Sequence, residues 1–308
     1  MNASVRSQPL ALRGGDLCEL ISRLAREASI EINAHDAGLL QASRAFLAPG
    51  QSVYISHLPQ QTWQATEQAC QQVRDAGFNP VPHLPVRLLP DERTLDTVLA
   101  GFVRTASVRE ILLISGDYPA PLGPYSQVAQ VMQTGRLQSN GIRRLSVAGH
   151  PEGHPTVGDG EIRRARLDKA EIAARAGLEL TLLTQFFFEP APFLAWSSAL
   201  RSQGVRCRIV GGLAGPARLT ALIKYAVRCG AGPSIRALTA RPAAFTKLLG
   251  DHGPESVLRA LAAARVSGQS DFDGIHLFCF GGYLRTCQWL RAIAAGRFEL
   301  DDNDSFKV

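Results

Sequence analysis

Eight strand-like runs alternate with helix-like stretches along this 308-residue chain, and this alternation limits the possible folds more than any other feature. The apolar runs that read as strands are 28–35, 51–58, 79–86, 110–117, 143–150, 179–186, 205–213 and 274–280. Alternating strands and helices are typical of a parallel sheet, and eight parallel strands close into a barrel with a packed interior. A doubly wound open sheet is the alternative, but no G-x-G-x-x-G motif follows the first run. We therefore predict an α/β fold, a (β/α)8 TIM barrel.

The helix-like stretches that separate the strands are 61–76, 91–105, 123–134, 161–176, 192–203, 218–229, 234–249, 254–266 and 284–294. Glycines at 77 and 177 follow two of them, as expected at helix C-termini. We expect residues 15–298 to form a single barrel domain. Residues 1–14 are expected to be a flexible leader and 299–308 a flexible acidic tail.

Composition excludes several classes of protein. No run of 18 apolar residues occurs, so no membrane-spanning helix is expected. The net charge of +6 is modest and no run of five basic residues occurs, which disfavours nucleic acid and fits a basic pocket for anionic small molecules. The six cysteines are scattered without a C-x-x-C pair, which indicates a reducing compartment, the cytoplasm. A homo-oligomer is left open.

Polar residues recur where the predicted strands end. They are Glu31, Ser56, His57, His83, Asp117, His150, Glu152, His154, Thr184 and Gln185. Because the carboxyl ends of barrel strands meet at one mouth, these side chains are predicted to form one site there.

Glu31 lies between Ile30 and Ile32. If both isoleucines face the helices, Glu31 points into the barrel, where burial is expected to raise its pKa and suit it to general acid catalysis. An interior carboxylate paired with an arginine is the alternative. In the same way, Asp117 can be a turn cap, and His83 a core histidine bonded to backbone.

The segment VAGHPEGHP at 147–155 resembles a metal site, with two histidines and a glutamate close together. However, Pro151 and Pro155 prevent a helix that would bring the histidines onto one face, and no nearby cysteine or aspartate completes a ligand set. We expect a rigid loop that shapes a pocket and no metal.

The segment TQFFFEP at 184–190 places an amide beside three phenylalanines. The Gln185 amide can both donate and accept hydrogen bonds, which suits the edge of a heterocycle, and a ring such as Phe187 offers stacking. Core packing is the alternative for two of the three rings.

Together, these blocks are similar to one known family. S-I-E-I, P-H-L, G-D, H-P-E-G-H-P and T-Q-F-F-F occur in order, and the chain resembles methylenetetrahydrofolate reductase of the bacterial single-domain kind over roughly residues 15–298. The resemblance implies a (β/α)8 barrel that binds FAD at its mouth. It implies that NADH reduces the flavin, which passes a hydride to 5,10-methylenetetrahydrofolate to give 5-methyltetrahydrofolate.

The resemblance also implies roles for individual residues. Glu31 matches the general acid on the folate, and Asp117 the aspartate between pterin and flavin, so both are expected to be catalytic and Asp117 also to bind substrate. Gln185 matches a pterin ligand, with Phe187 and Leu219 as further substrate contacts. The expected cofactor contacts are Ser56, His83, Ser115, His150, His154 and Lys169.

The chain departs from the family pattern near the cofactor. Ser115 stands where an arginine is usual, His150 replaces a tyrosine, Ala173 a lysine and Leu219 an aromatic residue, and residues 280–283 differ from the usual ending of strand eight. Lys169 shares a helix face with Ala173. We therefore predict that Lys169, or one of Arg163, Arg164 and Arg166, reaches the FAD phosphates.

Four functions follow from these observations. The leading one is a flavin-dependent reductase of one-carbon metabolism, whose direction, including oxidation of methyltetrahydrofolate in a demethylation pathway, the sequence does not set. The second is a flavin-free enzyme with direct hydride transfer from NADH to folate. The third is a non-redox folate-binding partner subunit, and the fourth a metal-dependent hydrolase on the same fold.

Overall fold

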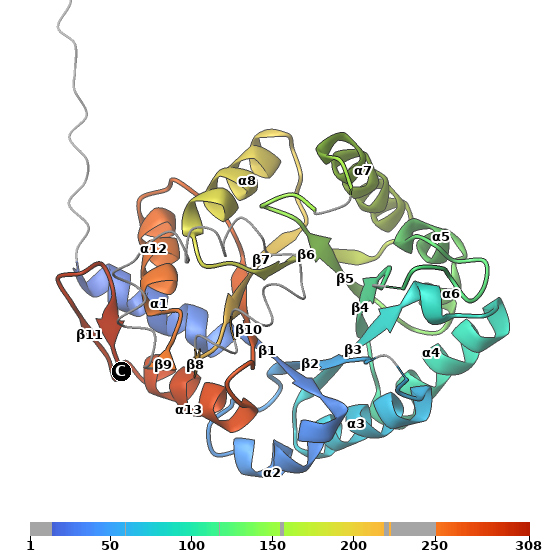
Figure 1. Ribbon diagram of the computed structural model, residues 1–308, viewed down its shortest axis with the longest axis horizontal. Helices are drawn as coiled ribbons and strands as arrows, with labels where there is room; N and C mark the ends of the chain where they lie inside the picture. The colour runs from blue at the N-terminus through green and yellow to red at the C-terminus, as the bar shows by residue number, and fades with distance from the viewer. Residues whose placement is uncertain (1–13, 59, 117, 155–156, 219–221, 223–250) are drawn as a thin grey trace, which may run out of the picture.

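A computed structural model confirms the predicted barrel (Figure 1). It describes residues 14–58, 60–116, 118–154, 157–218, 222 and 251–308. Eight parallel strands close in the order β1-β10-β7-β6-β5-β4-β3-β2. Their bounds are β1 Ser29–Asn33, β2 Ser52–Ser56, β3 Asn79–Pro85, β4 Glu110–Ile114, β5 Arg144–Gly149, β6 Glu179–Phe186, β7 Arg208–Ala214 and β10 Gly274–Phe278.

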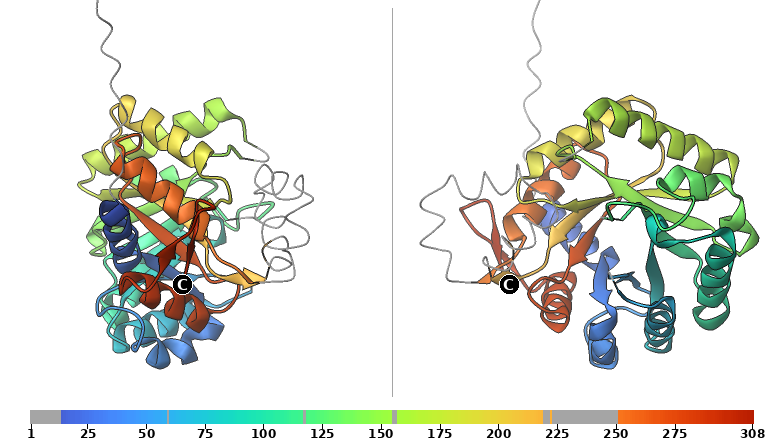
Figure 2. Two further views of the ribbon diagram at one scale, coloured as in Figure 1. Left: turned by 90° about the vertical axis from the view of Figure 1, so that its left-hand side faces the viewer. Right: turned by 45° about the vertical axis from the view of Figure 1, so that its right-hand side comes forward.

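Helices surround the strands, as the turned views show (Figure 2). They are α1 Gly14–Glu27, α2 Leu40–Ser43, α3 Trp63–Asp75, α4 Glu92–Ala106, α5 Val128–Gln133, α6 Arg136–Ser139, α7 Asp159–Arg175, α8 Pro190–Ser202, α12 Glu255–Val266 and α13 Tyr283–Ala294, with short 3-10 helices η1 Ala34–Leu39 and η2 Val86–Leu88. Side-chain caps fix two helix starts: Thr62 accepts a hydrogen bond from the backbone of Ala65, and Asp91 one from that of Thr94. Across the described ranges, no helix is long and apolar enough to cross a membrane.

Most predicted helices within the described residues are present with small shifts at their ends, but two points differ. The stretch predicted at 123–134 contains only the shorter α5, and Gly123 before it lies so close to the backbone of Pro90 that a Cβ atom would meet the Pro90 carbonyl oxygen at 2.2 Å. The helix α1 was not predicted, and it packs against α12 and α13. The helices predicted at 218–229 and 234–249 lie almost entirely outside the described residues.

The side chains of each strand alternate between two apolar regions. Ile30, Ile32 and Leu277 belong to the large core between the strands and the helices. Inside the barrel a second, smaller group fills the space between the strands; it comprises Tyr54, Val81, Leu112, Leu183 and Val210. Because both isoleucines that flank Glu31 face the helices, Glu31 projects into the barrel, as the alternation predicts.

The last residues do not extend as a free tail. Strands β11 Glu299–Leu300 and β12 Phe306–Lys307 pair as an antiparallel hairpin beside α12. Phe306 is buried, and the guanidinium of Arg259 on α12 donates hydrogen bonds to the carbonyl oxygens of Asp301 and Ser305. A second small pair, β8 Ala217–Arg218 with β9 Asp251–His252, follows β7.

Candidate functional site

A cluster of polar side chains lies inside the barrel. It consists of Ser29, Glu31, Ser56, His83 and His276, and we call it the polar cluster. Ser56 donates a hydrogen bond of 2.6 Å to Oε1 of Glu31. The other carboxyl oxygen, Oε2, lies 3.5 Å from Nε2 of His83 and 3.6 Å from Nε2 of His276. These three facing atoms are buried and have no hydrogen-bond partner within the protein. The barrel therefore brings Glu31, Ser56 and His83 together, as predicted from the strand ends.

Tyr54 separates the polar cluster from the end of the barrel at which the strands begin. Its ring contacts the rings of His83 and His276, with centroids 6.3 and 4.8 Å apart. Its hydroxyl points the other way and donates to Glu110, which starts β4. Since Glu110 marks the amino end of the strands, the polar cluster lies on the carboxyl side, where catalytic groups of such barrels gather.

His276 was missed in the sequence, although a signal was available. It lies between Ile275 and Leu277 on β10, and both of these neighbours belong to the outer core. The alternation that places Glu31 in the barrel places His276 there too. Parallel pairing of β1 with β10 then sets Ser29 opposite His276, and the Ser29 hydroxyl lies 2.8 Å from Nδ1 of the ring.

The expected rise in the pKa of Glu31 is wrong. Burial does raise the pKa of this carboxyl, but attraction by His83 and His276 and the hydrogen bond from Ser56 together outweigh burial, so that the pKa lies below its usual value. Glu31 is therefore ionised at neutral pH in the ligand-free protein. The alternative of an arginine partner does not describe the site either, because its partners are histidines and a serine.

Two histidines near the cluster remain neutral. Burial lowers the pKa of His83 despite the attraction of Glu31, and the neighbouring His276 lowers it further. His57, just after β2, stacks on Trp63 with ring centroids 4.0 Å apart, and its Nδ1 lies 2.8 Å from the Thr66 hydroxyl. Burial, together with His83, lowers the pKa of His57 to about 4.

Four phenylalanines adjoin the polar cluster, and we call Phe186, Phe188, Phe278 and Phe280 the aromatic wall. Phe186 ends β6 and contacts the rings of the other three, with centroids 4.8 to 5.8 Å apart. Phe278 ends β10, stacks on Phe280 and touches the ring of His276 at 4.8 Å. Phe188, Phe278 and Phe280 are only partly buried. Flat apolar faces beside hydrogen-bonding groups suit a planar heterocycle.

Gln185 and Phe187, both predicted to bind substrate, point in different directions. The register of β6 against β7 shifts between Leu183 and Phe186, and this bulge leaves Gln185 exposed at the carboxyl end of the strand. Phe187 is buried and stacks on Phe193 of α8, with centroids 4.9 Å apart. Phe187 thus packs the barrel against its helices, and the aromatic wall provides the rings at the mouth instead.

A second group of candidate residues comprises His150 after β5 and three basic residues along α7, and we call the three, Lys169, Arg166 and Arg163, the cationic cluster. The rings of His150 and His154 are in edge contact, with centroids 5.3 Å apart. Burial, His154 and Lys169 lower the pKa of His150 to about 4. Burial and Arg166 lower the pKa of Lys169, and burial and Arg163 that of Arg166, whose buried Nε has no hydrogen-bond partner within the protein. Such crowding of cations favours an anionic ligand.

Of the remaining residues that were predicted from the sequence, the structure describes only some. Ser115 is half-buried just after β4, and its carbonyl oxygen accepts a hydrogen bond of 3.2 Å from the backbone of Arg87. Ala173, which stands where the family resemblance leads one to expect a lysine, is buried in the outer core. This position therefore supplies no cation. Asp117 and Leu219 lie outside the described residues.

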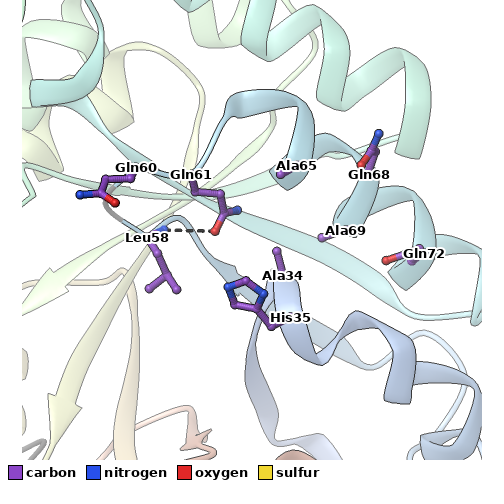
Figure 3. Close-up of a pocket in the computed structure, with 9 residues that line it drawn as sticks. All are labelled: Ala34, His35, Leu58, Gln60, Gln61, Ala65, Gln68, Ala69 and Gln72. Carbon is purple, nitrogen blue, oxygen red and sulfur yellow. Dashed lines mark hydrogen bonds between the residues drawn. The ribbon is translucent and has the colours of Figure 1, made fainter.

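A groove of about 490 Å³ is lined by residues from the segments that follow β1 and β2 and from α3 (Figure 3). It runs between η1 and α3, and four glutamines contribute to its lining. Its lining residues are Ala34, His35, Leu58, Gln60, Gln61, Ala65, Gln68, Ala69 and Gln72. The groove includes no member of the polar cluster, so we do not place the reaction in it.

No group of three or more His, Cys, Asp or Glu side chains in the described part of the chain is arranged to hold a metal ion.

The chain matches the model of a known protein family. A family model described as methylenetetrahydrofolate reductase matches residues 57–231, which is more than half of the chain. The matched span includes His83, the cationic cluster and Gln185. Glu31, Ser56 and His276 lie outside it, so their place in the site rests on the barrel geometry.

Proposed function

The chain belongs to the methylenetetrahydrofolate reductase family, and on this premise we propose that it interconverts 5,10-methylenetetrahydrofolate and 5-methyltetrahydrofolate by hydride transfer. The observation that supports this proposal best is the position of Glu31. A carboxyl group inside the barrel, between two histidines and beside the aromatic wall, suits proton transfer to a planar heterocycle bound at the mouth.

In the reductive direction Glu31 would protonate a nitrogen of the substrate as its five-membered ring opens, leaving an electrophilic iminium carbon to accept the hydride. Glu31 must be protonated for this step, although its pKa is low in the ligand-free protein. A bound heterocycle would exclude water from the cluster and strengthen the effect of burial, which raises the pKa. Substrate binding would therefore favour the protonated, active form.

Other side chains would orient the substrate and exclude water. Gln185, exposed at the end of β6, would pair with the pterin edge, and the aromatic wall would cover one face of a flat ring. Ser56 would hold the Glu31 carboxyl from β2. Asp117 is proposed to act beside them on the ground of the family resemblance alone.

The residues present fit FAD. The cationic cluster supplies charge for a pyrophosphate, including the buried Nε of Arg166 that has no partner within the protein. Lys169 and Arg166 would bind the phosphates, His150, His154 and Ser115 would line the path, and His83 with Ser56 would approach the ring. When bound, FAD supplies the two-electron carrier between NADH and the folate.

A flavin-free enzyme is the second candidate, and two positions favour it. Ser115 and the buried Ala173 lack the cations that usually stand there, each of which would contribute charge-assisted hydrogen bonds of about 1.5–3 kcal/mol. In this version NADH would pass its hydride to the folate directly, with the same role for Glu31.

The test is NADH consumption by the purified protein with 5,10-methylenetetrahydrofolate under anaerobic conditions, with and without added FAD. Turnover that requires FAD would support the flavoenzyme, and turnover without flavin would support direct transfer. If neither condition gives turnover, and oxidation of 5-methyltetrahydrofolate with an artificial electron acceptor is also absent, the redox proposal is wrong. A folate-binding role without redox chemistry would then be preferred.

A further inference from the structure

We propose that His276 is a positioning residue for Glu31: anchored at one ring nitrogen by Ser29, it presents the other to the carboxyl group and fixes that group for proton transfer. The inference rests on the proposed function for its consequence in turnover. Its structural content, the control of Glu31 by the Ser29–His276 pair, can be tested without turnover.

The geometry joins three side chains in a row. The Ser29 hydroxyl lies 2.8 Å from Nδ1 of His276, and Nε2 of the same ring lies 3.6 Å from Oε2 of Glu31. His276 has no exposed surface, and both its Nε2 atom and the facing oxygen lack hydrogen-bond partners within the protein. Contacts of catalytic groups are often long in the ligand-free state and shorten when substrate binds. This pair is therefore placed to close on ligand binding.

The ionised Glu31 carboxyl determines which atoms of Ser29 and His276 donate hydrogen bonds and which accept them. An ionised carboxyl can only accept hydrogen bonds, so Nε2 of His276 must carry a hydrogen to satisfy it. In the tautomer that carries its hydrogen on Nε2, Nδ1 is an acceptor for the Ser29 hydroxyl. Ser29 thus selects the tautomer that attracts the Glu31 carboxylate.

Other groups around the carboxyl do not duplicate this role. Ser56 of β2 holds the opposite oxygen, and His83 of β3 faces Oε2 from the other side. Cys279, just after β10, also lies near Glu31, but burial raises the pKa of its thiol well above the usual value and keeps it neutral. Tyr54 contacts the His276 ring, yet its hydroxyl is engaged with Glu110 and Ser146. His276 differs from these neighbours because the Ser29 hydroxyl, at its Nδ1 atom, fixes the orientation of its ring.

The test compares Ser29→Ala, His276→Leu and His276→Gln with the wild type in the full-length protein. Ser197→Ala is the matched control, because Ser197, like the half-buried Ser29, is bonded to a side chain, here the Ser270 hydroxyl, but lies on α8 outside the barrel. The first readout is the infrared titration of the Glu31 carboxyl, assigned by its loss in Glu31→Gln. The second is the kcat and KM of hydride transfer across pH.

We expect Glu31 to titrate at higher pH in both variants, because His276→Leu removes the ring that faces the carboxylate and Ser29→Ala removes the anchor that orients this ring. We expect kcat to fall about 10-fold in Ser29→Ala and about 100-fold in His276→Leu with little change in KM, and His276→Gln to recover part of the loss through its amide donor. If His276→Leu does not fold, Ser29→Ala, which removes one oxygen, still decides the question.

Outcomes for the inference and for the proposed function are distinguishable. If Ser29→Ala and Ser197→Ala match the wild type in both titration and kcat, His276 does not position Glu31, whatever the turnover. If the titration shifts in a protein that has no folate turnover, the positioning role stands and the proposed reaction is wrong.

Discussion

Nε2 of His83 lies 3.5 Å from Oε2 of Glu31, and both atoms are buried inside the barrel. The two residues sit on β3 and β1, with β2 between them, so their approach depends on the curvature of the closed sheet. His83 is kept neutral by burial while Glu31 is ionised, and this arrangement places one negative charge at the carboxyl end of the barrel. Under the proposed function, this carboxyl group, once protonated, would donate its proton to a substrate nitrogen as the ring of the folate opens.

Replacement of Glu31 by glutamine should abolish most turnover without unfolding the protein. Glutamine keeps the volume and can still bond Ser56, but it cannot transfer a proton. We expect kcat for the reduction of 5,10-methylenetetrahydrofolate to fall by about 10²–10⁴-fold. Glu110→Gln is the matched control, since Glu110 is another buried carboxylate of the barrel that bonds Tyr54, Ser146 and Arg144 at the opposite end. Equal kcat in Glu31→Gln and the wild type would exclude general acid catalysis by Glu31.

Lys169 offers a test of the cofactor site. Its pKa is lowered by burial and by Arg166, and a bound phosphate would relieve both effects. If Lys169 contacts the FAD phosphates, Lys169→Ala should weaken FAD binding about 10- to 100-fold, the value of one charge-assisted hydrogen bond. Titration of flavin fluorescence measures the affinity. Arg175→Ala, in the last turn of the same helix and paired with Glu171, should bind FAD as the wild type does. An unchanged affinity in Lys169→Ala would show that Lys169 is not the substitute for the missing lysine.

The protein should lose stability as pH falls from about 6.5 toward 4, because neutral histidines are buried in it. His57 takes up a proton at 6.5 when unfolded, but only at about 4 when folded. Protonation therefore favours the unfolded chain across this window, and the contribution of His57, complete above pH 6.5, is lost on acidification. The linkage amounts to roughly 3 kcal/mol at most.

Urea unfolding at a series of pH values measures this effect. His57→Gln should flatten the pH dependence of the free energy of unfolding, leaving the part due to His83, whose pKa is also lowered by burial, and to His150, whose pKa is lowered to about 4. His35→Gln, at an exposed histidine of η1, should leave the slope as in the wild type. The same slope in His57→Gln and the wild type would mean that His57 is not held neutral.

The sequence predicted the barrel and the inward position of Glu31 because both depend on local periodicity. Strand β6 was predicted with its observed ends, and Ile30 and Ile32 gave the orientation of their neighbour. The sign of the Glu31 pKa shift was not predictable in the same way. It depends on His83 and His276, which only barrel closure brings to the carboxyl group. The hairpin at 299–308 was missed for a similar reason, since the burial of Phe306 requires α12 as a partner.

The bulge in β6 links the fold to substrate binding, and Thr184 is the residue that stabilises it. The Thr184 hydroxyl accepts a hydrogen bond of 2.9 Å from the backbone of Gly212 and donates one of 2.8 Å to the carbonyl oxygen of Gln185. Gly212 fits there because a Cβ atom would meet the carbonyl oxygen of Thr184 at 2.5 Å. The hydroxyl thus fixes the backbone that carries the exposed Gln185.

Thr184→Val keeps the shape of the side chain but removes both hydrogen bonds and leaves the buried N–H of Gly212 without its acceptor. We expect the free energy of unfolding to fall by about 1–3 kcal/mol and KM for the folate to rise more than kcat falls, because Gln185 is less well oriented. Thr181→Val, in the regular part of the same strand, should leave KM unchanged. A stability loss in Thr184→Val with an unaltered KM would show that the bulge supports the barrel but does not aim Gln185 at the substrate.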